Sequence, residues 1–134
     1  MKKEKIILDT NIWVSYFFNG KLNELSKIIL DNDLRVFTTS FLIDELKDVL
    51  SREKIKKKLK FHLDSYIDFH QQVTEHFQIT EEFEGCPDPK DDFLFDLALQ
   101  SKTDTIVTGD KKLLDFKTEN ISVITLSEFL QDLL

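Results

Sequence analysis

The sequence predicts a three-layer α/β/α sandwich with a mostly parallel central sheet. Short apolar runs rich in β-branched residues alternate along the chain with segments whose apolar residues recur at three- and four-residue spacing. The first pattern is typical of buried parallel strands and the second of amphipathic helices. Only three Gly and two Pro occur in 134 residues, so the chain has few loops. We expect one domain over residues 1–134, long enough to bury a core without disulfides or metals.

Two strands and three helices are expected in the first part of the chain. The strands are short apolar runs, and the helices carry apolar residues on one face. In chain order these elements are a strand at 5–9, helices at 11–18 and 21–31, a strand at 34–38 and a helix at 41–50. Thr39 or Ser40 is expected to cap the last of these helices through its hydroxyl group.

The second part continues the alternation around an acidic loop at 81–89 that contains both prolines. Before the loop we expect a basic helix at 54–60, a longer helix at 61–76 and a short strand at 77–80. After it we expect a helix at 92–101, a strand at 105–108, a turn at 113–116, a strand at 121–125 and a final helix capped by Ser127. Asp88 and Asp91 are both suited to cap helix 92–101.

The charge of the chain is uneven. Its net charge of −7 argues against a sequence-independent nucleic-acid coat protein. Residues 51–62 nevertheless hold six basic residues and one acidic residue, a local balance of +5 that leaves −12 on the rest. Such a run is more often a solvated face than an RNA-binding patch. An acidic body with one basic patch also suits a cation site beside a place where an anionic polymer docks.

The cellular setting is predicted from what the sequence lacks. Cys86 is the only cysteine, which excludes a disulfide framework and a thiolate metal cluster. No apolar stretch resembles a signal peptide or a membrane span. We therefore expect a cytoplasmic protein that does not associate with membranes.

Acidic residues are predicted to converge at one edge of the sheet. Asp9 and Asp110 each follow a strand, and parallel strands present their carboxyl ends at the same edge, where ligands bind in open α/β sheets. Helices that follow strands begin at this edge too. This brings Glu45, Asp91 and Asp92 towards the two strand-end aspartates. Taken singly, each of these acids could equally end a strand, cap a helix or face solvent.

Converging carboxylates without a paired cation repel one another, so a bound cation is expected among them. Oxygen ligands of this kind suit Mg²⁺ or Mn²⁺, with waters completing the coordination. Such an ion activates water and stabilises in-line attack on phosphorus. Asn11, Thr10 and Thr108 would position metal-bound water or phosphate, and Asp96, one turn beyond Asp92, is a candidate accessory ligand.

Four segments, in this order, resemble the PIN-domain nucleases, and within them the toxin-like (VapC-like) branch of toxin–antitoxin systems. They are ILDTN at 7–11, TSFLIDEL at 39–46 followed by VLSR at 49–52, DPKDD at 88–92 running into LAL at 97–99, and IVTGDKKLL at 106–114. The resemblance covers most of the chain.

The resemblance implies a PIN-like fold and a Mg²⁺- or Mn²⁺-dependent endoribonuclease. Asp9, Glu45, Asp91 or Asp92, and Asp110 would be its catalytic and metal-binding acids; the register with Ala98 favours Asp91. It further implies an RNA substrate, the role of toxin in a toxin–antitoxin pair, an antitoxin protein that covers the site, and a homodimer.

Two other functions compete with that of a nuclease. A phosphoacceptor signalling domain also places aspartates at strand ends around Mg²⁺, but it needs a phosphorylatable Asp after a central strand, where this chain has Glu45 on a helix. A catalytically inactive PIN-like module that only binds RNA or protein is the other, and intact acids in all four segments argue against it.

Overall fold

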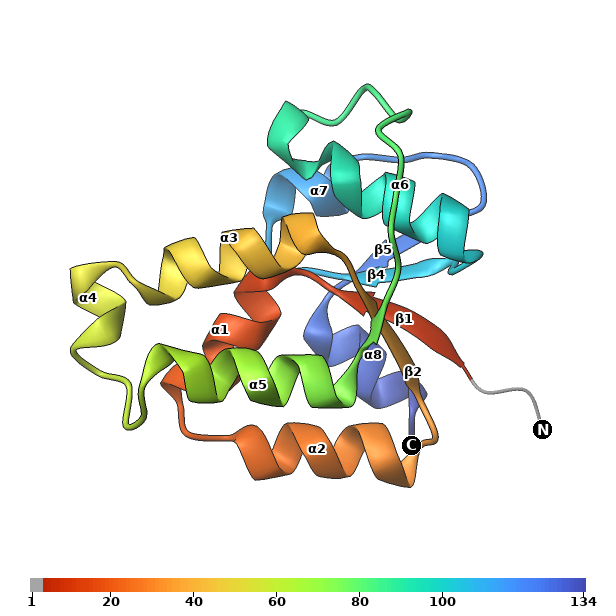
Figure 1. Cartoon of the computed structure of the whole chain (residues 1–134). Coiled ribbons are helices and arrows are strands. Elements are labelled where there is room, and N and C mark those ends of the chain that lie inside the picture. The colour runs from red at the N-terminus through yellow and green to blue at the C-terminus, as the bar shows by residue number, and fades with distance from the viewer. Residues whose placement is uncertain (1–3) are drawn as a thin grey trace.

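Residues 4–134 are described by the computed structural model, in which helices cover both faces of one five-stranded sheet (Figure 1). The strand order is β3-β2-β1-β4-β5, and every neighbouring pair is parallel. The strands are β1 (Lys5–Leu8), β2 (Arg35–Thr38), β3 (Glu75–His76), β4 (Thr105–Val107) and β5 (Ser122–Ile124). The predicted sandwich with its parallel sheet is confirmed.

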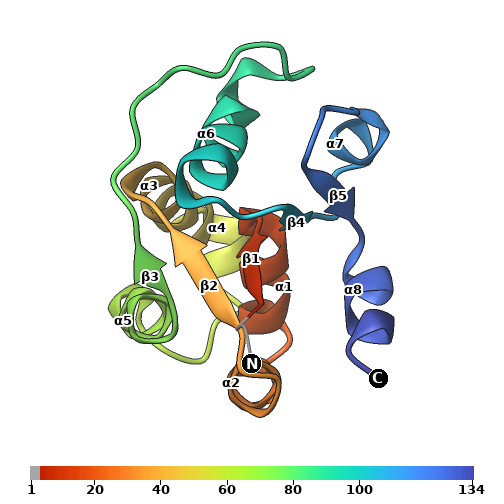
Figure 2. The same ribbon diagram turned by 90° about the vertical axis from the view of Figure 1, so that its right-hand side faces the viewer.

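Helices lie on both sides of this sheet. They are α1 (Thr10–Phe18), α2 (Leu22–Asp31), α3 (Ser40–Leu50), α4 (Glu53–Lys56), α5 (Leu63–Val73), the 3₁₀ turn η1 (Pro89–Asp91), α6 (Asp92–Ser101), α7 (Lys111–Asp115) and α8 (Leu126–Asp132). Figure 2 shows α6 and α7 above the sheet, with α1, α5 and α8 below it. Within the described residues, no helix is long and apolar enough to span a bilayer.

The core lies between the inner strands and the helices packed on them. Ile7 and Ile106 are fully buried because helices cover both faces of a parallel sheet. Trp13 of α1 is also fully buried, and its Nε1 donates to the carbonyl oxygen of Leu8 at 3.0 Å. This bond satisfies the polar atom of the largest core side chain and holds α1 against the end of β1.

The basic segment and its neighbours differ from the prediction. The helix expected at 54–60 ends earlier, as α4 (Glu53–Lys56): none of its residues is fully buried, and only Ile55 and Leu59 of the segment pack, partly buried, against the core. The helix expected at 61–76 is shorter, as α5. The strand expected at 77–80 was wrong: β3 lies at Glu75–His76, where Glu75 pairs with Phe37 of β2 and its carboxylate contacts Arg35 at 2.7 Å.

The capping predictions were partly wrong. Thr39 precedes α3, but its side chain makes no capping hydrogen bond. The final helix is capped by Thr125 and not by Ser127, because Thr125 and Glu128 form a reciprocal capping box. Neither Asp88 nor Asp91 caps the helix at 92–101 with its side chain: Asp88 caps the preceding 3₁₀ turn η1, accepting from the backbone N–H of Lys90 at 3.0 Å, and Asp91 makes no capping hydrogen bond.

An extended segment, which we call the strap (residues 77–88), joins β3 to η1. Figure 2 shows it climbing from β3 past the sheet edge to α6, from one face of the sheet to the other. Asp96 of α6 holds it by accepting from the backbone N–H groups of Glu82 and Phe83 at 3.1 and 2.8 Å. Gln100 adds two bonds to the backbone of Thr80. The strap is thereby fixed along the middle and the last turn of α6.

Candidate active site

A pocket of about 530 Å³, which we call the acidic pocket, opens at the carboxyl ends of β1 and β4. Four acidic residues line it, and each comes from a different segment of the chain: Asp9, Glu45, Asp91 and Asp110. The first and last follow β1 and β4, which are neighbours in the sheet. Glu45 is carried by α3, and Asp91 ends η1 at the entrance to α6. The pairing of two strands and the approach of two helices therefore assemble one acidic site.

Asp9 is the most buried of the four acids, at 4% exposure. Its carboxylate accepts from the backbone N–H of Thr10 at 2.7 Å and from the hydroxyl of Thr108 at 2.8 Å. Its pKa is raised to about 6: burial is the largest cause, the hydrogen bonds from Thr108 and Thr10 lower it, and the charges of Glu45 and Asp110 raise it. Asp9 is thus an acid held in a fixed orientation without a compensating positive charge.

A small hydrogen-bond network ties the end of β1 to the end of β4. The side-chain amide of Asn11 donates to Asp9 and to the Thr108 hydroxyl, both at 3.3 Å, and its oxygen accepts from the backbone N–H of Gly109 at 3.0 Å. The Thr108 hydroxyl in turn accepts from the backbone N–H of Asp110 at 3.0 Å. Asn11 and Thr108 therefore hold the two strand-end aspartates in position.

Asp91 is half-buried, and its pKa is raised to about 7. Burial is the largest cause, followed by the negative charges of Asp9, Asp88, Glu45 and Asp110. Because the charges of Asp9, Glu45 and Asp110 all raise this pKa, the carboxylate of Asp91 lies within electrostatic reach of the other three pocket acids. Asp91 makes no capping hydrogen bond to α6, so its carboxylate is not committed to the helix end.

No cation within the described chain neutralises this group. Among residues 4–134, none of the four acids forms an ion pair with a Lys, Arg or His side chain. In the same residues, no three or more Asp, Glu, His or Cys side chains are gathered closely enough to hold a metal ion by themselves. The acids line one pocket and repel one another across it, without forming a closed coordination shell.

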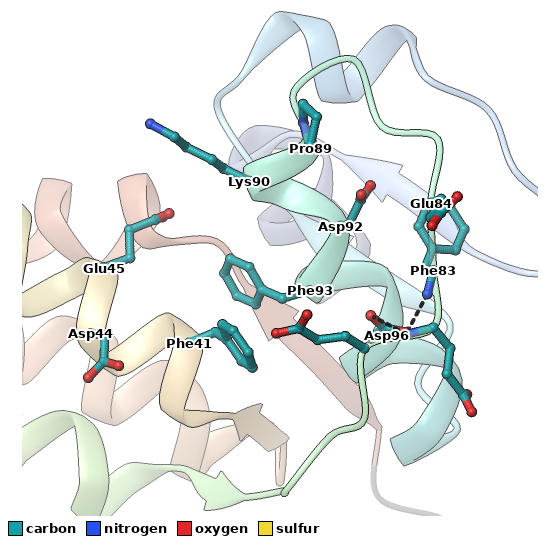
Figure 3. Close-up of a pocket in the computed structure, with 12 residues that line it drawn as sticks. Phe41, Asp44, Glu45, Phe83, Glu84, Pro89, Lys90, Asp92, Phe93 and Asp96 are labelled. Carbon is teal, nitrogen blue, oxygen red and sulfur yellow. Dashed lines mark hydrogen bonds between the residues drawn. The ribbon is translucent and has the colours of Figure 1, made fainter.

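Asp92 and Asp96 lie elsewhere. The carboxylate of Asp92 accepts from the backbone N–H of Cys86 at 3.0 Å, and Asp96 is buried beneath the strap. Both line a second pocket of about 620 Å³, the strap pocket, together with Phe41 and Phe93 (Figure 3). Glu45 borders this pocket as well as the acidic one. In the close-up the two aspartates lie on the side of α6 that faces the strap.

The remaining lining residues were not all predicted. Ser15 and Asn19 line the acidic pocket and follow Asn11 at four-residue steps along α1, a helical spacing that the sequence displays. Val49 and Ile55 form an apolar wall. No sequence signal points to Ile55, because α4 reaches the pocket only through the tertiary fold.

Thr10 carries an unpartnered polar atom. Its side chain is buried, and its hydroxyl oxygen has no hydrogen-bond partner within the described residues. Thr10 also lines the acidic pocket. An unsatisfied buried hydroxyl costs free energy, on the order of 1–3 kcal/mol.

The fold and the pocket together define a class of protein: an α/β domain with an acidic site at the carboxyl edge of a parallel sheet. The chain belongs to the PIN domain family, whose sequence pattern matches residues 5–112. That region contains all four acids of the pocket. No curated protein matches the chain significantly.

Solved structures share this fold at low sequence identity. A chain of VapBC2 from Rickettsia felis, solved bound to a DNA fragment from its promoter, is 16% identical with a TM-score of 0.59, over 90% of this chain and 98% of that chain. The PIN domain endonuclease Utp24 is 16% identical with a TM-score of 0.54, over 91% and 84%. PAE2754 from Pyrobaculum aerophilum is 14% identical with a TM-score of 0.52, over 97% and 89%.

Proposed function

We propose that this chain is a Mg²⁺- or Mn²⁺-dependent endoribonuclease that uses Asp9, Glu45, Asp91 and Asp110 as its acids. The observation that carries the proposal is the convergence of four carboxylates on one pocket without a paired cation. Membership of the PIN domain family supports nuclease chemistry. The choice of RNA rests on the resemblance of the four sequence segments to the toxin-like branch.

The donor set fits a small divalent cation. All four acids offer carboxylate oxygens, which Mg²⁺ and Mn²⁺ prefer. The acids are too dispersed to form a complete shell, and Mg²⁺ is usually held by one or two carboxylates plus waters. The unpartnered Thr10 hydroxyl would bond to such a water or to a phosphate oxygen.

The chain's own residues would each have a defined task. Asp9 and Asp91 would bind the cation; burial is the largest cause of their raised pKa values, and the repulsion by neighbouring acids, which adds to it, is what the cation would relieve. When bound, the cation would supply activation of water and charge stabilisation at the phosphorus. Asn11 and Thr108 would keep the Asp9 carboxylate in one orientation. The wall of Val49 and Ile55 would limit access of bulk water to the pocket.

We propose further that the protein is the toxin of a toxin–antitoxin pair, inhibited by an antitoxin that covers the site, and that it acts in the cytoplasm as a homodimer. The support is the resemblance of the segments at 7–11, 39–52, 88–99 and 106–114 to the VapC-like branch. The likeness to a VapBC2 chain agrees with this in fold.

An RNA cleavage assay tests the proposed function. The purified chain is incubated with single-stranded RNA in Mg²⁺, in Mn²⁺ and in a chelator, beside Asp9→Asn and the matched control Asp104→Asn. We expect cleavage with either metal, none in the chelator, and a loss of at least about 100-fold in Asp9→Asn only. Asp104 is exposed and lines neither the acidic pocket nor the strap pocket. Cleavage that survives both the chelator and Asp9→Asn would contradict the proposal, and no cleavage at all would favour an inactive binding module.

A further inference from the structure

A third pocket, of about 490 Å³, lies where α1 ends and the link between α4 and α5 passes over it. Its lining includes Phe18, Lys58, Lys60, Phe61 and Tyr66. Figure 1 shows that α4, its link to α5 and the end of α1 gather at one end of the molecule. We call it the basic pocket.

The basic pocket combines aromatic rings with unpaired positive charge. The Nζ atom of Lys58 lies 5.3 Å from the centroid of the Phe18 ring. Phe61 is 57% exposed although it is a large apolar side chain, and its ring centroid lies 6.1 Å from that of Tyr66. No acidic residue lines the pocket, and within residues 4–134 neither Lys58 nor Lys60 forms an ion pair.

This pocket adjoins the acidic pocket. Phe18 and Asn19 line both of them. Between the two, the exposed polar residues Asn11, Ser15 and Asn19 follow one another along one face of α1. Eight helical residues rise about 12 Å, which is about two nucleotide steps of an extended strand. A strand held at the acids would therefore reach the basic pocket with a nucleotide about two positions away.

Lysines and exposed aromatic rings form the combination that binds single-stranded nucleic acid without strong sequence preference. The lysines attract phosphates, and the rings stack on bases. The only charged residues that line the basic pocket are lysines, although the chain has a net charge of −7. Beside an acidic site, such a pocket suits a polyanion that extends beyond that site.

We propose that the basic pocket holds a nucleotide that flanks the cleaved phosphodiester of a single-stranded RNA, with its base against Phe61 and Phe18 and its phosphate at Lys58 and Lys60. This inference rests on the proposed endoribonuclease function. It assigns a role in binding and positioning to Lys58, Lys60 and Phe61, which do not line the acidic pocket. The charge of their segment alone did not indicate such a role.

The charge part of the proposal is tested by binding. Fluorescence anisotropy of a labelled oligouridylate is measured over a range of salt concentrations, with every protein carrying Asp9→Asn to prevent cleavage. The test variant is Lys58→Gln with Lys60→Gln. The matched control is Lys54→Gln with Lys57→Gln, which removes equal charge from the same segment but from outside both pockets.

We expect the test pair to weaken binding about tenfold and to reduce the slope of log K against log salt by about 1.4, or 0.7 for each lost phosphate contact on a single strand. The control pair should weaken binding by less than about threefold and leave the slope nearly unchanged. Equal effects of the two pairs would overturn the proposal, because the lysines would then act only through general charge.

The stacking part is tested at Phe61. Phe61→Ala should weaken oligouridylate binding about tenfold without changing the salt slope, and Phe61→Trp should restore it, because any base stacks on an aromatic face. Phe61 is exposed, so neither variant should affect folding. Unchanged binding in Phe61→Ala would overturn the stacking role.

Cleavage by the proteins that retain Asp9 separates the two proposals. If the parent chain cleaves RNA and the basic-pocket variants bind and cleave like it, the inference about the basic pocket fails alone. If the parent cleaves no RNA in either metal but the binding pattern above is found, the proposed function fails and the basic pocket stands as an RNA-binding site.

Discussion

Asp9 shows how one residue couples stability to function. It is buried, it accepts bonds from Thr10 and Thr108, and it faces the charges of Glu45 and Asp110. Burial of a carboxylate beside like charges destabilises the folded chain unless a cation or a proton neutralises it. The arrangement is costly in a metal-free protein and favourable once a cation binds.

The substitution Asp9→Asn should therefore stabilise the metal-free protein more at neutral pH than at acid pH. The pKa of Asp9 is about 6 in the folded protein and 3.8 as its ordinary value, so between these values the folded state binds more protons than the unfolded state. The contribution of Asp9 to stability is thus lost as the pH rises through about 6. We expect the free energy of unfolding of the variant, relative to the parent, to rise by about 2 kcal/mol between pH 4 and pH 8.

Urea unfolding in a chelator at several pH values measures this difference. Asp104→Asn is the control and should give a flat difference, because Asp104 is exposed. A flat difference for Asp9→Asn would show that the carboxylate is not destabilised by its surroundings.

At the scale of elements, the strap and α6 decide which aspartate faces the acidic pocket. Adjacent residues on a helix point about 100° apart, so Asp91 and Asp92 cannot both face it. Asp92 is turned to the backbone N–H of Cys86 and Asp96 to those of Glu82 and Phe83, which fixes the rotation of α6. We interpret Asp96 as an anchor of the strap and not as an accessory metal ligand.

The substitution Asp96→Ala should loosen the strap. It removes the acceptor of two backbone N–H groups, at Glu82 and Phe83, from a site that is only 3% exposed, and such a loss typically costs about 1–3 kcal/mol. Hydrogen exchange should become faster at these two amides, whereas Glu84→Ala, on the exposed part of the strap, should leave it unchanged. Unchanged exchange in Asp96→Ala, with loss of metal binding, would instead support a ligand role.

For the whole molecule, the sequence predicts most of the architecture because the inner strands are continuous apolar runs. It does not predict β3, because its two residues, Glu75 and His76, are polar and exposed and join the sheet only through their pairing with β2. The sequence does predict that Asp9 and Asp110 lie close together, since both follow parallel strands. It cannot choose between Asp91 and Asp92, because the rotation of α6 depends on contacts with a strap that has no periodic pattern.

For the basic segment (residues 51–62), the sequence likewise does not predict where the side chains lie. Its charge is visible in the sequence, but a helix of four residues with one half-buried side chain gives no pattern from which to place Ile55 at one pocket and Lys58 at another. The tertiary fold links these positions, and with them the two halves of the proposed RNA path.

In the proposed function, the acidic pocket binds a divalent cation through Asp91 and not through Asp92. Calorimetric titration of Mn²⁺ into the metal-free chain tests it most directly, with Asp91→Asn and Asp92→Asn as a matched pair. Both substitutions remove one charge from neighbouring positions, and the side-chain amide that Asp92→Asn introduces would keep an oxygen for the backbone N–H of Cys86. We predict that Asp91→Asn weakens Mn²⁺ binding by more than about tenfold, whereas Asp92→Asn changes it by less than about twofold. Equal weakening in both variants, or weakening in Asp92→Asn alone, would contradict the account.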